Sequence, residues 1–84
     1  MHYRNGRMAN NGDPVVQIST DGKGTITHVG TLIGATPGND YCNGTIADPV
    51  TQSFSGACMC DCLHMEDVAA LLKDKGLENR PKAK

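Results

Sequence analysis

A run of cysteines in the second half of the chain is the part of this sequence most able to do chemistry. Cys58-Met59-Cys60-Asp61-Cys62-Leu63-His64 carries three thiols and an imidazole at alternate positions. Side chains alternate between the two faces of an extended strand, so a strand here would direct all four groups to one face. Thiolate sulfur and imidazole nitrogen are ligands that zinc prefers in proteins. Cys42, in a loop, is the natural fourth ligand beside the three cysteines of this segment.

Three interpretations of the cysteines remain open on the sequence alone. Two residues along a strand separate Cβ atoms by roughly 6.7 Å, against about 3.8 Å in a disulfide, so neighbouring cysteines of the strand would not bridge one another. The cysteines could hold a metal, form one disulfide that uses Cys42, or stay reduced and pack as small apolar side chains. A structural zinc is the cofactor that these residues could imply. Its candidate ligands are Cys42, Cys58, Cys60, Cys62 and His64.

The sequence offers little for catalysis. His64 could join the cysteines, or it could cap a backbone group where a strand meets a helix. A Cys–His nucleophile pair is usually oriented by a third group, and none is visible beside Cys62 and His64. Gly22-Lys23-Gly24 is not followed by the Lys-Ser/Thr and helix start of a phosphate loop. We therefore expect a protein that is not an enzyme.

Short strands must position these residues. Glycine turns such as Asn5-Gly6 and Asp21–Gly24 separate runs that are rich in β-branched residues, as expected of strands joined by tight turns. The runs predict strands near 14–19, 25–33 and 57–64. Shorter strands are expected near 45–47 and 51–54.

The pattern changes at Met65, where a helix is predicted over about 65–76. Val68, Leu71 and Leu72 recur at helical spacing. Acidic residues open this segment, cations close it, and Gly76 follows, which suits the helix dipole and a glycine C-cap. We expect one domain over residues 1–77 with this helix included, and a flexible tail over 78–84.

Two turn-and-strand motifs carry a family resemblance. Gly12-Asp13-Pro14-Val15-Val16, followed by Asp21-Gly22-Lys23-Gly24-Thr25-Ile26, resembles the opening of SH3-like barrels of the KOW type. The wider frame of Tyr3-x-Asn5-Gly6-Arg7, Cys42-Asn43-Gly44 and Cys62-Leu63-His64 is similar to short uncharacterised proteins of bacteria and phage. The resemblance implies a mostly β fold, namely a small SH3-like barrel of five or six short strands with a C-terminal α-helix. It carries no catalytic residues with it.

The charge layout limits the partners. Residues 25–72 hold five acidic residues and no lysine or arginine, whereas nucleic-acid binders concentrate cations on one face. Nucleic acid is therefore an unlikely partner. No apolar run is long enough to span a membrane and the N-terminus is polar, so we expect a cytoplasmic protein without a membrane partner.

The function expected from these features is a small binding or accessory module that contacts a protein partner or associates with itself. The alternative is a small zinc-binding protein with a structural Cys/His site. A weak nucleic-acid-binding barrel is a further alternative, carried only by the cations at the two chain ends.

Overall fold

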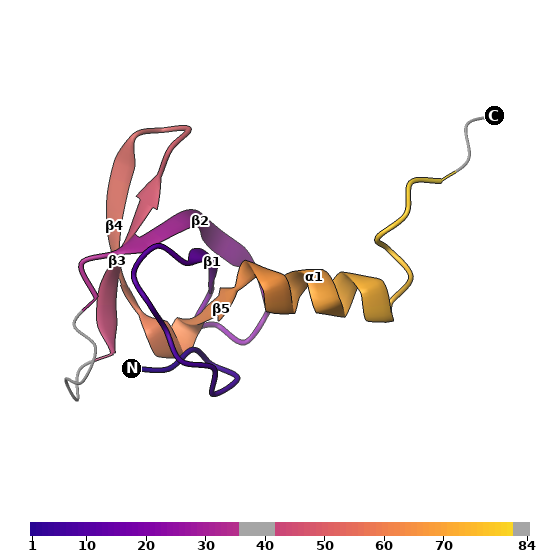
Figure 1. Cartoon of the computed structure of the whole chain (residues 1–84), viewed down its shortest axis with the longest axis horizontal. Helices are drawn as coiled ribbons and strands as arrows, with labels where there is room; N and C mark the ends of the chain where they lie inside the picture. The colour runs from indigo at the N-terminus through magenta and orange to yellow at the C-terminus, as the bar shows by residue number, and fades with distance from the viewer. Residues whose placement is uncertain (36–41, 82–84) are drawn as a thin grey trace.

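The computed structural model describes residues 1–35 and 42–81, and this part of the chain forms one antiparallel sheet followed by one α-helix (Figure 1). The elements are β1 Pro14–Ile18, β2 Ile26–Ile33, β3 Asn43–Asp48, β4 Ser53–Cys58, the 3-10 helix η1 Met59–Asp61, β5 Cys62–His64 and α1 Met65–Asp74. The expected mostly β fold with five strands and a C-terminal helix is confirmed. Residues 82–84 of the expected tail lie outside the described part of the chain.

The sheet is strongly curled. Its strand order is β4-β3-β2-β1-β5, so the two edge strands are consecutive in the sequence and only η1 separates them. In a flat sheet, strands spaced by about 4.8 Å would hold these edges roughly 19 Å apart. The four residue steps from Cys58 to Cys62 reach at most about 14 Å when fully extended. The sheet must therefore bend until its two edges approach each other.

The core lies on the face of the sheet that carries Leu32 and Ile46, which are register partners on β2 and β3 and are both fully buried. Two glycines allow the strands to pack this closely. A Cβ atom at Gly30 would collide with the carbonyl oxygen of Ala47, and one at Gly44 would lie 2.7 Å from Cδ1 of Leu32. The buried apolar cluster consists of Tyr3, Ala9, Val15, Leu32, Ala35, Ile46, Ala57, Met59 and Cys62.

The N-terminal turn is anchored on the start of α1. Gly6 has a φ of 88°, and its amide donates to the carbonyl of Tyr3 at 2.9 Å. Arg7 forms ion pairs with Glu66 at 3.0 Å and with Asp67 at 3.3 Å. These ion pairs join the N-terminal turn to α1, about sixty residues later in the sequence.

The helix α1 extends away from the sheet rather than covering it (Figure 1). None of its residues is buried, and Leu71 and Leu72 remain 56% and 45% exposed. Its end follows the expected glycine pattern, since Gly76 has a φ of 70° and Leu77 donates its amide to the carbonyl of Leu72 at 2.8 Å. No described helix has the length and apolar character needed to cross a membrane.

Candidate metal centre

Segment 57–64 is not the single strand expected from its alternating cysteines. β4 ends at Cys58, η1 occupies Met59–Asp61, and β5 begins at Cys62. β4 pairs with β3 whereas β5 pairs with β1, so the chain must turn between the two edges of the sheet. A 3-10 helix has three residues per turn and therefore interrupts the alternation of a strand. The prediction of one extended strand with four ligands on one face is wrong.

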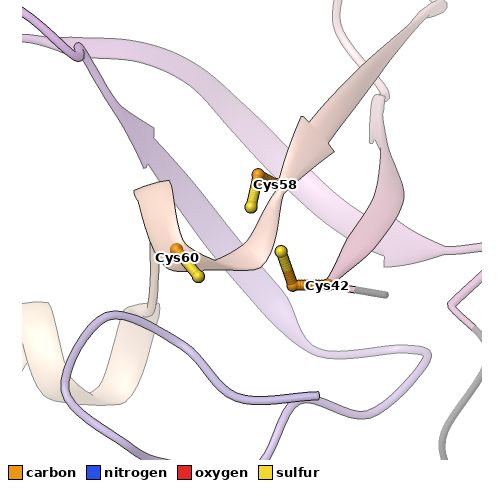
Figure 2. Close-up of side chains that lie close together, drawn as sticks. All are labelled: Cys42, Cys58 and Cys60. Carbon is orange, nitrogen blue, oxygen red and sulfur yellow. The ribbon is translucent and has the colours of Figure 1, made fainter. Parts of the chain in front are cut away.

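Three cysteines nevertheless come together where β3 begins and β4 ends (Figure 2). The sulfur atoms of Cys42, Cys58 and Cys60, called here the cysteine triad, all lie within 4.8 Å of one another. Cys42 and Cys58 are half-buried and Cys60 is exposed, so ions can reach the group. Thiolates are soft ligands that select zinc, copper(I) or iron–sulfur clusters. The cysteine triad could therefore hold a metal ion.

The β3–β4 ladder sets the positions of the first two cysteines. Asn43, the first residue of β3, is the register partner of Cys58, the last residue of β4. One step further, the amide of Met59 donates to the carbonyl of Cys42 at 2.7 Å. Met59 is fully buried, and its side chain fixes the start of η1 in the core. The two thiols therefore belong to neighbouring backbones that hydrogen bonds hold together.

Arg4 holds the third cysteine from the other end of the sequence. Its Nε donates to the carbonyl of Cys60 at 3.0 Å, and its amide donates to the carbonyl of Cys62 at 3.0 Å. Its guanidinium also forms an ion pair with Asp61 at 3.4 Å. Two of these contacts tie η1 to the N-terminal segment and the third ties the start of β5 to it, which makes Arg4 a positioning residue for the Cys60 thiol.

The thiols of the cysteine triad affect one another's ionisation. Hydrogen bonds from the Cys58 and Cys60 thiols lower the pKa of Cys42. The interaction with Cys42 raises the pKa of Cys58 to about 11. Of these two residues, Cys42 is therefore the first to become a thiolate, which is the form that binds metals and reacts with oxidants.

Cys62 lies outside the triad, in the hydrophobic core. It is completely buried, and its thiol donates to the carbonyl of Cys58 at 3.5 Å. Burial raises the pKa of the Cys62 thiol to about 11, which keeps it protonated at neutral pH. Cys62 matches the interpretation of a reduced thiol that packs as a small apolar residue.

His64 also lies outside the triad and caps the helix. Its Nδ1 accepts a hydrogen bond from the amide of Glu66 at 3.0 Å, as an N-cap of α1, and its side chain is buried. Its Nε2 faces the carboxylate of Asp13 at 3.7 Å. Asp13 accepts a hydrogen bond from the hydroxyl of Tyr3 at 2.7 Å, and burial together with this contact raises the pKa of Tyr3. Both imidazole nitrogens are thus directed toward structural partners.

Sequence reasoning missed the two residues that support these groups. Arg4 is separated from Cys60 by 56 residues, and Tyr3 from Asp13 by 10. The Asn5-Gly6 turn signal predicted that the chain reverses here, but it carried no information on which later element the turn contacts. No family model, curated protein or solved structure matches this chain.

Proposed function

We propose that the chain is a small, non-enzymatic binding module in which the cysteine triad holds one zinc ion. The observation that carries the proposal is the separation of the sulfur atoms of Cys42, Cys58 and Cys60, which is at most 4.8 Å. Two thiolates on a tetrahedral zinc, with bonds of about 2.3 Å, lie roughly 3.8 Å apart. A closure of about 1 Å or less, by rotation of the side chains, brings the triad to this geometry.

The zinc would cross-link the start of β3 to the end of β4 and to η1, which follows β4 directly in the chain. Cys42 immediately precedes β3, Cys58 is the last residue of β4, and Cys60 belongs to η1. Domains of this size have a small core, and they often depend on a metal for their last few kcal/mol of stability. Among the described residues the ligand group has three members, so water or a partner's side chain would complete the coordination. We also propose a reducing, cytoplasmic setting, in which cysteine thiols stay reduced.

Zinc binding is tested with purified, reduced protein. We expect one zinc per chain, and a lower melting temperature once a chelator removes it, because a structural metal contributes to the free energy of folding. Cys42→Ser, Cys58→Ser and Cys60→Ser should each lose the bound zinc. Cys62→Ala and His64→Asn are the matched controls and should retain it. Absence of bound zinc together with an unchanged melt would contradict the proposal.

A protein partner or a second copy of the chain is a further candidate, supported by an apolar groove beside the β3–β4 turn. Thr31, Ala47, Pro49 and Phe54 line this groove. Phe54 is 70% exposed and the neighbouring Val50 is 89% exposed, and exposed apolar side chains that gather in one patch are typical of protein interaction surfaces. Self-association through this groove predicts a dimer that Phe54→Ser disrupts and Leu77→Ser does not. A monomer at all concentrations in sedimentation would exclude it.

Nucleic-acid binding is the weakest of the three proposals. Arg4 and Arg7 form ion pairs with Asp61, Glu66 and Asp67, so these two guanidinium groups are less able to contact phosphate. Any binding should be nonspecific and lost at moderate salt. Sequence-dependent, sub-micromolar binding at about 150 mM salt would reverse this ranking.

The SH3-like relationship is likewise retained as a proposal. Five antiparallel strands, the short turn from β4 to β5 and the resulting curl of the sheet support it. A barrel of this kind does not determine a ligand by itself, so the proposed function depends on the cysteine triad and the groove.

A further inference from the structure

We propose that the cysteine triad is also an oxidation site, at which a peroxide joins Cys42 and Cys58 in a disulfide and leaves Cys60 as a thiol. The disulfide step requires no metal. Its consequence for metal binding rests on the proposed zinc site. The inference adds a covalent, reversible modification to the proposed zinc ligands, and it assigns Cys58 as the partner of Cys42 in the single disulfide that the sequence left open.

The backbone brings Cys42 and Cys58 within bridging distance. Cys42 precedes Asn43, the register partner of Cys58. Paired residues of an antiparallel ladder have Cα atoms about 4.5–5.5 Å apart, and one residue along a strand adds about 3.4 Å, so the diagonal is about 6 Å. Disulfides span Cα separations of about 4.4–6.8 Å. Figure 2 shows the two side chains directed toward each other, so that rotation of the side chains is sufficient.

The other two cysteines are poorer partners. Cys60 lies in η1, beyond the end of the β3–β4 ladder, and Arg4 holds its carbonyl at 3.0 Å. A bond between Cys58 and Cys60 would close a small ring within the turn that contains η1. Cys62 is completely buried, so an oxidant in solution does not reach its sulfur.

The chemistry balances with hydrogen peroxide as the oxidant. The sulfur of one thiolate attacks a peroxide oxygen, the O–O bond breaks, and a sulfenic acid and hydroxide form. The sulfur of the second thiol then attacks the sulfenic sulfur, the S–O bond breaks, and the hydroxyl leaves as water with the proton of that thiol. Two thiols lose two electrons, and one peroxide is reduced to two waters. An external dithiol reverses the step by exchange.

Oxidation would remove two of the three zinc ligands. A disulfide sulfur is a much weaker ligand than a thiolate, because thiolate is the metal-binding form of cysteine. Bound zinc would conversely slow the oxidation by occupying the same sulfurs. Metal binding and disulfide formation are therefore mutually exclusive states of the cysteine triad.

The test uses reduced, metal-free protein treated with a small excess of hydrogen peroxide. Residues 25–72 contain no lysine or arginine, so trypsin leaves all four cysteines in one peptide, and chemical cleavage after methionine is the better method. Cleavage after Met59 and Met65 keeps Cys42 and Cys58 in one fragment and releases residues 60–65 with Cys60 and Cys62. A Cys42–Cys58 bond makes the first fragment lighter by two hydrogens. A bond to Cys60 links the two fragments.

We expect the first fragment to carry the bond, and we expect residues 60–65 to be released with both thiols free. Cys60→Ser should keep the bond, and Cys42→Ser or Cys58→Ser should lose it. Linked fragments, oxidation to sulfinic acid without a bond, or no reaction would each overturn the inference. Zinc binding measured on the same protein separates the two proposals. A Cys42–Cys58 bond in protein that never binds zinc supports the oxidation site and contradicts only the proposed zinc function.

Discussion

The guanidinium of Arg4 donates from Nε to the carbonyl oxygen of Cys60 at 3.0 Å, across 56 residues of sequence. The same residue donates its backbone amide to the carbonyl of Cys62 at 3.0 Å. Arg4 therefore contacts both Cys60 of η1 and Cys62, the first residue of β5, although it is not itself one of the proposed metal ligands.

Arg4→Ala should weaken zinc binding by the triad, although the variant retains all three cysteines. Supporting contacts around metal ligands typically contribute 10–100-fold in affinity, so we expect a loss of about tenfold. Competition with a chromophoric chelator measures the affinity. Arg7→Ala is the matched control, because Arg7 pairs with Glu66 and Asp67 on α1 and does not contact η1. Equal affinities in the two variants would contradict the positioning role of Arg4.

His64→Ala should destabilise the fold without affecting metal binding. The variant removes the N-cap contact to the amide of Glu66, and caps contribute roughly 0.5–2 kcal/mol to the free energy of unfolding. His64→Asn keeps a capping side chain and should be less destabilised. Urea unfolding checks the difference between the two variants. A change below about 0.5 kcal/mol in His64→Ala would show that the cap is not needed.

The pH midpoints for alkylation of two triad thiols should be displaced in opposite directions from that of an ordinary cysteine. The pKa of Cys42 is lowered and that of Cys58 is raised to about 11, so Cys42 should form the reactive thiolate at the lower pH. In metal-free protein, the iodoacetamide rate at Cys42 should rise with pH, with a midpoint below that of an ordinary cysteine thiol. Cys58→Ala removes one of the two thiol hydrogen-bond donors to Cys42 and should move this midpoint upward. A midpoint for Cys42 above that of Cys58 would contradict the assignment.

Gly30→Ala should be among the most destabilising single substitutions in the sheet. The added methyl would collide with the carbonyl oxygen of Ala47, and backbone yields less readily than a side chain, so we expect a loss of about 1–3 kcal/mol. Gly56→Ala on β4 is the control, because a Cβ there meets nothing within 4 Å. Thermal unfolding distinguishes the two variants. If both are equally stable, the close approach of β2 and β3 does not require a glycine.

Local pattern predicted most of the elements. Turn glycines and β-branched runs predicted strands near 14–19 and 25–33, where the structure has Pro14–Ile18 and Ile26–Ile33. The apolar spacing of Val68, Leu71 and Leu72 predicted α1, because helix periodicity is encoded within a few consecutive residues. The presence of four cysteines, and therefore the possibility of a thiolate site, was also evident from the sequence.

Tertiary structure decided which cysteines meet. Alternation along segment 57–64 is compatible with a strand, but β4 must leave one edge of the sheet and β5 must join the other, and this long-range requirement imposes the turn of η1. The turn separates Cys60 from Cys62, directs one toward solvent and buries the other. Cys42 joins the group through pairing between β3 and β4, and Arg4 supports it from the opposite end of the chain. Residue types are set by the sequence, but such contacts depend on how a curled sheet brings distant segments together.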